Sequence, residues 1–463
     1  MENLCPRGDM IRKVLVANRG EIAIRVMRSC KEMGIRTVAV YSETDRTARH
    51  VMYADEAALI GPAASKESYL NIDNLIAAAK RHHADAIHPG YGFLSENADF
   101  ARRCKQEGLI FIGPSAETME AMGDKIAARK RMIAAEVPVV PGTEQPLQSA
   151  EEALRVCEEI GFPVMLKASM GGGGKGMRLI HEKGEVVEAY HTARSESLSS
   201  FGDDTVYIEK FVEEPHHIEF QILGDNHGNV IHLFDRECSV QRRNQKIVEE
   251  SPSPFLTADL RKEMGEKAVA AAKAVHYSGA GTIEFLVDKD RHFYFLEMNT
   301  RLQVEHPITE EVRIANNEVL HLRQEDLFQR GHAIECRICA EDTENNFMPS
   351  PGIIRQLTEP NGIGVRIDSY VYEGYEIPVY YDPMIGKLIV WATTRAYAIE
   401  RMRRVLYEYK ITGLKTNLSY LKRIMHTPDF VKGEYNTLFI EKNSRMLLRS
   451  NGNNEEIENI AMI

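Results

Sequence analysis

The chain has 463 residues, of which 43% are hydrophobic and 27% are charged, and its formal net charge is −11. This length allows roughly two to four domains, and the composition is that of an ordinary soluble protein. The negative charge argues against general binding to nucleic acid or to anionic membranes. Because no apolar run of about eighteen residues and no signal-peptide core is present, we expect a cytoplasmic protein.

Alternating strands and helices are predicted for the first part of the chain. The pattern predicts strands at residues 13–20, 37–41, 84–88 and 109–113, and helices at 21–33, 70–82 and 98–107. Such alternation favours an open parallel sheet, a Rossmann-like domain over residues 1–114 of an α/β protein. Functional loops are expected after the strands, at residues 16–21 and 88–92.

The middle of the chain, residues 115–330, is predicted to form a second domain. Ser115 opens a helix that carries Gly123-Asp124-Lys125, and a Pro- and Gly-rich boundary follows at 138–146. Residues 138–204 read as a mobile β-α-β lid, with a polar, hinge-like stretch at 195–202. Short strands and two late helices, at 397–409 and 418–425, predict a C-terminal α+β domain over 331–445.

The seven cysteines, an odd number without regular spacing, indicate a reducing compartment. Cys336 and Cys339 form a C-x-x-C pair within a predicted strand, where the two thiols face opposite sides. The sequence has no second such pair to complete a zinc site, so metal binding or redox chemistry is not favoured here.

A glycine-rich loop at residues 171–176 lies between two predicted strands. Gly171, Gly173 and Gly176 satisfy G-x-G-x-x-G, but a dinucleotide site needs a helix after the glycines, and the sequence has no Walker A motif. Strand, glycines and strand instead predict a hairpin lid whose N–H groups close over phosphates, with Lys167 as a fixed cation. A merely flexible turn is the alternative.

A second hairpin is predicted around the polar turn at residues 288–291. Glu284 and Glu297 occupy apolar strands on either side of this turn and fall roughly opposite each other, with Asn299 on the same face. Carboxylates in such strands are costly unless they are paired or bound to a cation, and Mg²⁺ suits this oxygen-rich set. The alternative is an edge hairpin with two solvated glutamates.

The lid, the lysine strand and the Glu…Glu-x-Asn hairpin together resemble an ATP-grasp nucleotide site. Longer motifs, spread from about residue 11 to residue 445, resemble biotin carboxylase, which performs the ATP-dependent first half-reaction of acetyl-CoA, propionyl-CoA and pyruvate carboxylases. These motifs are Ala17-Asn-Arg-Gly-Glu-Ile-Ala, His88-Pro-Gly-Tyr-Gly-Phe-Leu-Ser-Glu-Asn, Met122-Gly-Asp-Lys, Gln241-Arg-Arg-Asn-Gln-Lys, Glu297-Met-Asn-Thr-Arg-Leu-Gln-Val-Glu-His-Pro and Glu335-Cys-Arg-Ile-Cys-Ala-Glu-Asp.

The resemblance implies ATP and Mg²⁺ (or Mn²⁺) as cofactors, and it assigns nucleotide and metal contacts. The implied phosphate and lid residues are Lys125, Lys167, Gly171, Gly172, Gly173, Gly174 and Gly176. The implied adenine, ribose and phosphate neighbours are Glu209, Lys210, His217, Gln241 and Asn244, and the implied metal ligands are Glu284, Glu297 and Asn299.

The resemblance also implies the carboxylation chemistry. Lys246, Arg301, Gln303 and the backbone of Val304 hold bicarbonate, and Glu305 removes its proton. Bicarbonate then attacks the γ-phosphate of ATP to give ADP and carboxyphosphate, which releases CO₂ and phosphate. The phosphate deprotonates biotin, and Arg337 stabilises the biotin enolate that captures CO₂. For each charge taken singly, a surface ion pair is the alternative.

The resemblance further implies partners. The sequence contains no Ala-Met-Lys-Met-type biotinylation site and no carboxyltransferase domain. We therefore expect biotin on a separate biotin carboxyl carrier protein, a carboxyltransferase subunit, and a homodimer of this chain.

Three departures from the family pattern keep other functions open. Asn244 stands where the family usually has histidine, and Met170 replaces the first glycine of the lid run. The join between Glu310 and Arg313 is shorter than the pattern by roughly ten residues, near three helical turns. The alternatives are a non-catalytic nucleotide-binding homologue and another ATP-grasp carboxylate–amine ligase, which would not need Arg301–Glu305 or Arg337.

Overall fold

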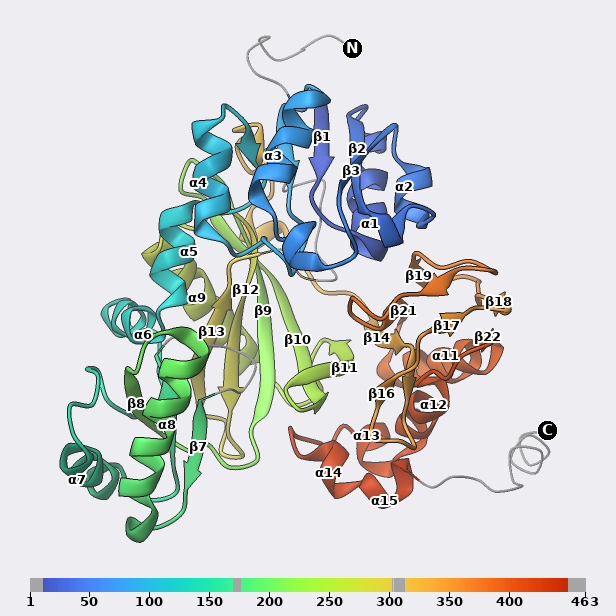
Figure 1. The fold of residues 1–463 in the computed structure, drawn as a ribbon. Helices are drawn as coiled ribbons and strands as arrows, with labels where there is room; N and C mark the ends of the chain where they lie inside the picture. The colour runs from blue at the N-terminus through green and yellow to red at the C-terminus, as the bar shows by residue number, and fades with distance from the viewer. Residues whose placement is uncertain (1–10, 170–175, 302, 304–312, 449–463) are drawn as a thin grey trace.

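The computed structural model describes residues 11–169, 176–301, 303 and 313–448. Figure 1 shows the N-terminal part in blue at the top, the lid in green at the lower left and the C-terminal part in orange and red at the lower right, with the long strands β9 to β13 between them. Among the described residues, no helix combines the length and the apolar character that a membrane span needs.

The N-terminal part is built on one five-stranded sheet in the order β3-β2-β1-β4-β5, and every neighbouring pair is parallel. The predicted open parallel sheet is therefore confirmed. The edge strand β3 was not predicted, because half-exposed residues alternate along it and leave no long apolar run. The elements are β1 (Lys13–Val16), α1 (Gly20–Glu32), β2 (Arg36–Ser42), α2 (Arg49–Tyr53), β3 (Glu56–Gly61), α3 (Ile72–Arg81), β4 (Ala86–His88), α4 (Ala98–Gln106) and β5 (Ile110–Phe111).

The loops that follow β1 and β4 lie side by side, because these two strands are parallel neighbours in register. Asn18 ties the loops together: its Nδ2 donates to the carbonyl oxygens of Pro89 and Tyr91 at 2.7 and 2.8 Å. Gly90 is required at this contact, since a Cβ there would lie 2.8 Å from Nδ2 of Asn18. Two predicted loops are thus fixed at one edge of the sheet, as expected.

His50, at the start of α2, is fully buried, and its Nε2 lies 3.2 Å from the carbonyl oxygen of Val40. Burial lowers the pKa of His50 to about 4, although the charge of Asp45 partly opposes this and Arg19 adds to it. The unfolded chain therefore binds the proton first as the pH falls below about 6.5.

We expect the native state to lose about 3 kcal/mol of stability through this group as the pH falls from 6.5 through 4. In His50→Gln, which keeps an N–H donor for Val40, this part of the loss should disappear. Thermal unfolding from pH 7 to pH 4 measures the difference, and His181→Gln, at an exposed histidine, is the control. Parallel pH profiles for His50→Gln and the wild type would contradict the assignment.

The helix predicted to begin at Ser115 is two helices, α5 (Ala116–Gly123) and α6 (Lys125–Ala134). Ser115 caps the first, as predicted, by accepting a hydrogen bond from the Thr118 N–H. Asp124 interrupts the run because its backbone is extended and its Oδ1 accepts from the N–H groups of Ile126 and Ala127. Lys125 is consequently the first residue of a helix.

The lid contains a three-stranded antiparallel sheet in the order β7-β6-β8, and the predicted strand pair on either side of the glycines is confirmed. The hinge predicted at residues 195–202 is wrong, since this stretch is the end of α8. Its polar residues follow buried Val186, Tyr190 and Ala193, and the helix stops at Gly202 with φ of 76°. The elements are α7 (Ala150–Ile160), β6 (Val164–Ala168), β7 (Met177–Ile180), α8 (Val186–Phe201) and β8 (Val206–Lys210).

An eight-stranded sheet in the order β13-β12-β9-β10-β11-β14-β21-β19 joins the middle of the chain to its C-terminal part. The predicted hairpin is formed by β12 and β13, with Glu284 directly opposite Glu297. Helix α9 packs on β9, β10 and β12. The bounds are β9 (His216–Gly224), β10 (Val230–Arg242), β11 (Gln245–Ser251), α9 (Ala258–Ala274), β12 (Gly279–Val287) and β13 (Phe293–Asn299).

The C-terminal part packs its helices on β14 and β21, and its core also includes Val240 and Val248 of β10 and β11. Both late helices are confirmed. Cys336 and Cys339 are buried free thiols in β14. The elements are β14 (His332–Cys339), β15 (Glu341–Asp342), β16 (Met348–Pro349), β17 (Gly352–Ile353), β18 (Gln356–Thr358), β19 (Val365–Ser369), β20 (Glu376–Ile377), β21 (Met384–Ala392), α11 (Arg395–Glu408), β22 (Lys410–Thr412), α12 (Leu418–His426), α13 (Pro428–Lys432), α14 (Phe439–Lys442) and α15 (Ser444–Leu447).

Candidate active site

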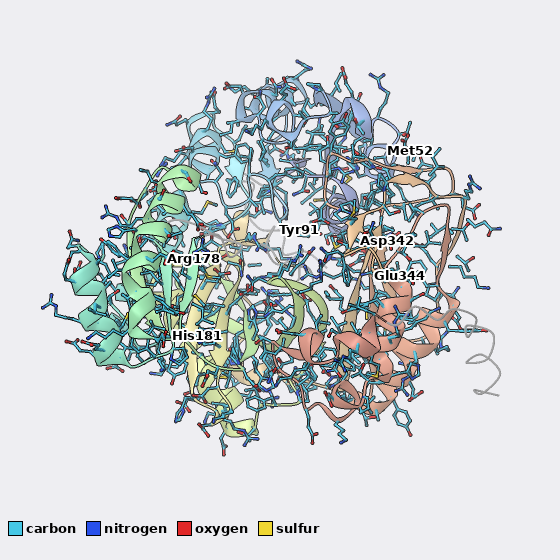
Figure 2. The ribbon with its side chains drawn as sticks, turned by 60° about the horizontal axis from the view of Figure 1, so that its bottom comes forward. Met52, Tyr91, Arg178, His181, Asp342 and Glu344 are labelled. Carbon is cyan, nitrogen blue, oxygen red and sulfur yellow. The ribbon has the colours of Figure 1, made fainter. Side chains whose placement is uncertain are left out.

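A cleft of about 1260 Å³ lies where the N-terminal part, the lid and the C-terminal part meet. Figure 2 shows Tyr91, which lines this cleft, near the centre of the molecule, with Arg178 of the lid on one side and Asp342 of the C-terminal part on the other. The predicted loops after β1 and β4 both reach the cleft.

The cleft gathers most of the residues that the sequence nominates. The lining includes Lys125, Lys167, Glu209, Lys210, His217, Gln241, Asn244, Lys246, Glu284, Glu297, Asn299, Arg301, Gln303 and Arg337. Gly176 is placed at the base of the lid, where its carbonyl accepts a hydrogen bond from the Ala168 N–H. Met170, Gly171, Gly172, Gly173, Gly174, Val304, Glu305 and residues 310–312 lie outside the described residues.

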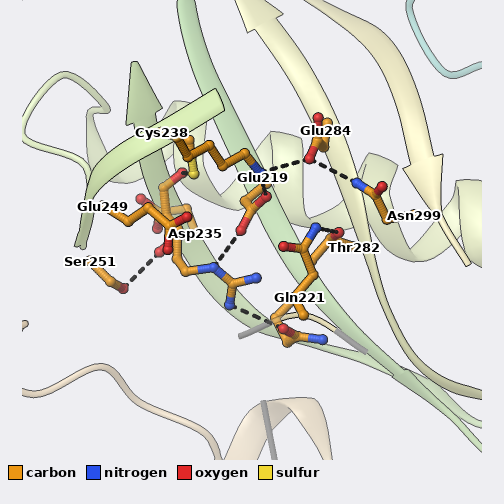
Figure 3. Close-up of polar contacts among 12 residues, drawn as sticks. Glu219, Gln221, Asp235, Cys238, Glu249, Ser251, Thr282, Glu284 and Asn299 are labelled. Carbon is orange, nitrogen blue, oxygen red and sulfur yellow. Dashed lines mark hydrogen bonds and ion pairs between the residues drawn. The ribbon is translucent and has the colours of Figure 1, made fainter. Parts of the chain in front are cut away.

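Lys246 on β11 is the centre of a buried cluster of charges. Its Nζ donates to Glu219 and, at 2.8 Å, to Oε1 of Glu284. Glu284 also accepts from His217 at 2.7 Å, and Glu219 accepts from Arg236 at 2.5 Å. Figure 3 shows Glu219 between the ends of the two cationic side chains, with Glu284 beside it.

The pKa values in this cluster follow from mutual pairing. Burial opposes the charge on Lys246, but the carboxylates around it hold its pKa well above the usual value. Burial likewise opposes ionisation of Glu284, but Lys246 and His217 hold its pKa well below the usual value. The pKa of His217 is raised, because the carboxylate of Glu284 outweighs the effect of burial. Lys246 therefore presents a permanent cation to the cleft.

Glu297 has a different environment from its neighbour across the hairpin. Burial, and then the charge of Glu284, raise the pKa of Glu297, while Lys125 acts in the opposite direction. Among the described residues, no hydrogen-bond donor contacts its carboxylate. The Asn299 amide lies next to the pair and donates to Glu284 Oε1 at 2.8 Å. Glu297, which faces Glu284 in register and is short of positive charge, therefore fits a divalent cation such as Mg²⁺ beside it.

Three cations surround the carboxylate of Glu209 and the adjoining floor of the cleft. Lys167 Nζ on β6 and Arg129 Nη1 on α6 contact Glu209 at 2.5 and 3.1 Å. Burial lowers the pKa of Lys125, and the carboxylate of Glu297 partly restores it. Because Lys125 begins α6, its charge adds to the positive end of the helix, an arrangement that suits phosphate groups.

Arg301 and Gln303 continue the hairpin into the cleft. Arg301 Nη2 donates to Asn299 Oδ1 at 2.8 Å, and its Nε donates to Glu96 at 2.9 Å. Gln303 is anchored by a 2.8 Å hydrogen bond from Nε2 to the Thr282 hydroxyl. Both side chains line the cleft, as their alternating spacing predicts.

Arg337 on β14 donates to Glu249 of the neighbouring strand β11. It lines the same cleft as Lys246. The cleft thus combines a cationic region at the start of α6, a carboxylate pair and two fixed cations from different strands. This arrangement can bind a nucleotide triphosphate and a small anion next to each other.

Several residues in or next to the cleft have no role in the sequence-based prediction. Glu219, which is fully buried and holds both Lys246 and Arg236, was not nominated. Its signal was available, because it is a carboxylate in an apolar strand like Glu284. Glu21 and Tyr91 belong to loops that were predicted to be functional, and the Tyr91 hydroxyl donates to Glu21.

Comparisons with known proteins cover almost the whole chain. Family models match "Biotin carboxylase, N-terminal domain" at residues 10–119, "Carbamoyl-phosphate synthase L chain, ATP binding domain" at 124–315 and "Biotin carboxylase C-terminal domain" at 335–442. A biotin carboxylase from Nostoc sp. is 55% identical over 93% of this chain and 98% of its own length. A pyruvate carboxylase subunit from Methanothermobacter thermautotrophicus is 53% identical over 94% of this chain and 91% of its own length.

Solved structures agree with the sequence matches. The biotin carboxylase domain dimer of a Hydrogenobacter thermophilus 2-oxoglutarate carboxylase, in complex with MgADP, ADP and bicarbonate, has a TM-score of 0.91 and 48% identity, covering 96% of this chain and all of that one. A Campylobacter jejuni biotin carboxylase–βγ-ATP complex has a TM-score of 0.90 and 48% identity, covering 93% and 99%. The fold is therefore ATP-grasp, as predicted, and the chain belongs to the biotin carboxylase family of ATP-dependent enzymes.

Proposed function

We propose that this protein carboxylates biotin on a separate carrier protein, at the expense of ATP and bicarbonate. The observation that carries the proposal is the single cleft in which Lys246, Arg301 and Arg337 lie beside the carboxylate pair of Glu284 and Glu297. A carboxylate–amine ligase of the same fold would not need both Lys246 and Arg337 as fixed cations in the part of the cleft that would bind bicarbonate. The family match supports the same reaction.

In this proposal the nucleotide lies between the lid and the middle part. Lys125 and Lys167 bind its phosphates, Gly171–Gly176 close over them, and Glu209 and Lys210 contact adenine. His217, Gln241 and Asn244 lie beside the ribose and phosphates. Glu284, Glu297 and Asn299 would hold Mg²⁺, which supplies charge neutralisation for the phosphate oxygens.

Bicarbonate is held by Lys246, Arg301, Gln303 and the backbone of Val304. Glu305 takes the proton from its hydroxyl, and the resulting oxyanion attacks the γ-phosphorus while the bond to ADP breaks. Carboxyphosphate then releases CO₂ and phosphate, and the phosphate removes the biotin ureido proton. Arg337 stabilises the enolate that attacks CO₂. Glu219 and Glu249 position the two fixed cations.

We further propose that a biotin carboxyl carrier protein and a carboxyltransferase subunit complete the enzyme, and that this chain forms a homodimer. The dimer in the related Hydrogenobacter structure supports the last point. We also propose the division into residues 1–114, 115–330 with the lid at 138–204, and 331–445. The three family matches support the three domains and the separate sheet β7-β6-β8 supports a lid, although one eight-stranded sheet crosses residue 330.

The proposed base is tested with Glu305→Gln. The amide is isosteric but accepts no proton, so bicarbonate-dependent ADP release with free biotin should fall by at least about 100-fold. Glu376→Gln, at an exposed carboxylate on β20, is the control. Unchanged ADP release in Glu305→Gln would remove Glu305 as the base, and no ADP release by the wild type would overturn the proposed function.

Asn244→His tests whether the family departure impairs the enzyme. Asn244 has φ of 63°, a conformation that asparagine and histidine both adopt more readily than most residues, and both side chains donate hydrogen bonds. We therefore expect kcat and the KM for ATP to change by less than about threefold. Recovery of turnover from near zero would instead favour a non-catalytic nucleotide-binding protein.

A further inference from the structure

The turn between β10 and β11 is held from outside the cleft by Asn346, which lies in the loop between β15 and β16. Nη2 of Arg242 donates to the Asn346 carbonyl oxygen at 2.9 Å and to its Oδ1 at 3.0 Å. Nη2 of Arg243 donates to the same Oδ1 at 3.4 Å. Strand β11 pairs with β14 of the C-terminal part (Figure 1), and one exposed side chain further links two arginines of the turn to this part.

Arg242 differs from the residues around it in the direction of its side chain. Gln241 and residues 243–246 line the cleft, whereas Arg242 is not among the described residues that line it. Its guanidinium instead lies 4.0 Å from the centre of the Phe347 ring, a cation–π contact that adds to the two hydrogen bonds. The turn thus has one face in the cleft and the other against residues 346–347.

The residue types in this turn do not by themselves favour the backbone conformation that the turn adopts. Gln241 pairs with Lys246 and Arg242 with Gln245, which leaves Arg243 and Asn244 as a two-residue connection. Both have positive φ, 50° and 63°, as type I′ turns require. Asparagine suits this conformation but arginine does not, so contacts from elsewhere must hold Arg243 in it.

We propose that Asn346 is a positioning residue for the nucleotide: by fixing Arg242 and Arg243 it holds Gln241 and Asn244 in the cleft. The inference rests on the proposed function, in which the latter two residues contact ATP. Lys246, although only two residues after Asn244, is held separately by Glu219 and Glu284. Asn346 should therefore affect nucleotide binding and leave bicarbonate binding unchanged.

Asn346→Gly removes the side-chain hydrogen bonds of Asn346 and keeps the one that its backbone carbonyl accepts. Asn346 itself has φ of 53°, which glycine adopts freely, so the variant loses the Oδ1 acceptor without backbone strain. We expect the KM for ATP and the Kd for MgADP to rise about five- to tenfold, because the acceptor of two hydrogen bonds from charged groups is lost, one of them long, with the KM for bicarbonate within about twofold of wild type. Amide hydrogen exchange of a peptide covering residues 239–247 should become faster.

Asn346→Asp and Asn345→Gly complete the design. The aspartate keeps an acceptor for both arginines and should restore the KM for ATP to within about twofold of wild type. Asn345 makes its described hydrogen bonds through its backbone alone: its N–H donates to Asp342 and its carbonyl accepts from the Met348 N–H, so Asn345→Gly should behave as wild type. The inference is overturned if Asn346→Gly leaves exchange and the KM for ATP unchanged, if both KM values rise together, or if Asn346→Asp gives no rescue. If the wild type is inactive, the proposed function is overturned instead. The role of Asn346 is then still decided by two measurements, amide hydrogen exchange and the Kd for MgADP.

Discussion

Lys246→Met is expected to lower bicarbonate-dependent ADP release by about 10²- to 10³-fold, because it removes a fixed cation from the place where we propose that bicarbonate binds. It should also destabilise the protein by about 3 kcal/mol, since Glu219 and Glu284 lose a shared partner in a buried site. Steady-state ADP release and thermal unfolding measure the two effects. Lys262→Met, at an exposed lysine whose pair with Glu266 spans 4.0 Å, is the control.

Lys246→Arg separates lost function from lost folding. The guanidinium keeps the positive charge between the two carboxylates, so the melting temperature should stay near that of wild type. Its different shape should still misplace bicarbonate and lower turnover by at least about tenfold. If Lys246→Met kept wild-type ADP release, the lysine would be a structural cation only, and the bicarbonate site would lie elsewhere in the cleft.

The hairpin of Glu284 and Glu297 shows how much of this site the sequence predicts. The polar turn between two apolar runs predicts the hairpin, but the register next to the turn would put Glu284 opposite Leu296. A β-bulge between Glu284 and Phe285 shifts the register and brings Glu284 opposite Glu297. The open parallel sheet followed in the same way from local periodicity, with loops that reach the cleft. Features of this kind depend on residues close together in the chain.

Features that depend on distant contacts were not predictable from the sequence. Glu219 meets Lys246 only because β9 and β11 both pair with β10, and Arg337 meets Glu249 across 88 residues. The break at Asp124 is local by contrast, because its side chain caps the N–H groups two and three residues further on, and the N-cap preference of aspartate was its signal in the sequence. The polar residues at 195–202 suggested a hinge, but the stretch is helical. Helix α8, of which it is the end, packs against the lid sheet, and this packing is not visible in the local sequence.

Glu297→Gln should stabilise the protein in the absence of divalent cations while it abolishes most activity. Glu297 is buried opposite Glu284, and both burial and that charge raise its pKa above the ordinary value of 4.5. The folded state therefore holds the Glu297 proton more tightly than the unfolded chain, so wild-type stability falls as the pH rises from about 4.5 through the folded pKa. The glutamine variant escapes this loss, and its advantage should grow over that pH range and then stay constant.

At pH 7.5 with EDTA we expect the melting temperature of Glu297→Gln to exceed that of wild type by about 1–2 °C, from about 1 kcal/mol of relieved repulsion. Added MgCl₂ should raise the melting temperature of wild type more than that of the variant, because the variant lacks one of the carboxylates that we propose as Mg²⁺ ligands, and ADP release should fall by at least about 100-fold. Asp290→Asn, at an exposed carboxylate in the turn of the same hairpin, should change neither quantity. A variant that is destabilised in EDTA, or that keeps the full Mg²⁺ response, would show that Glu297 stabilises the fold through contacts of its own and does not hold the metal. Opposite signs for stability and activity are what distinguish a residue placed for a cation from one placed for packing.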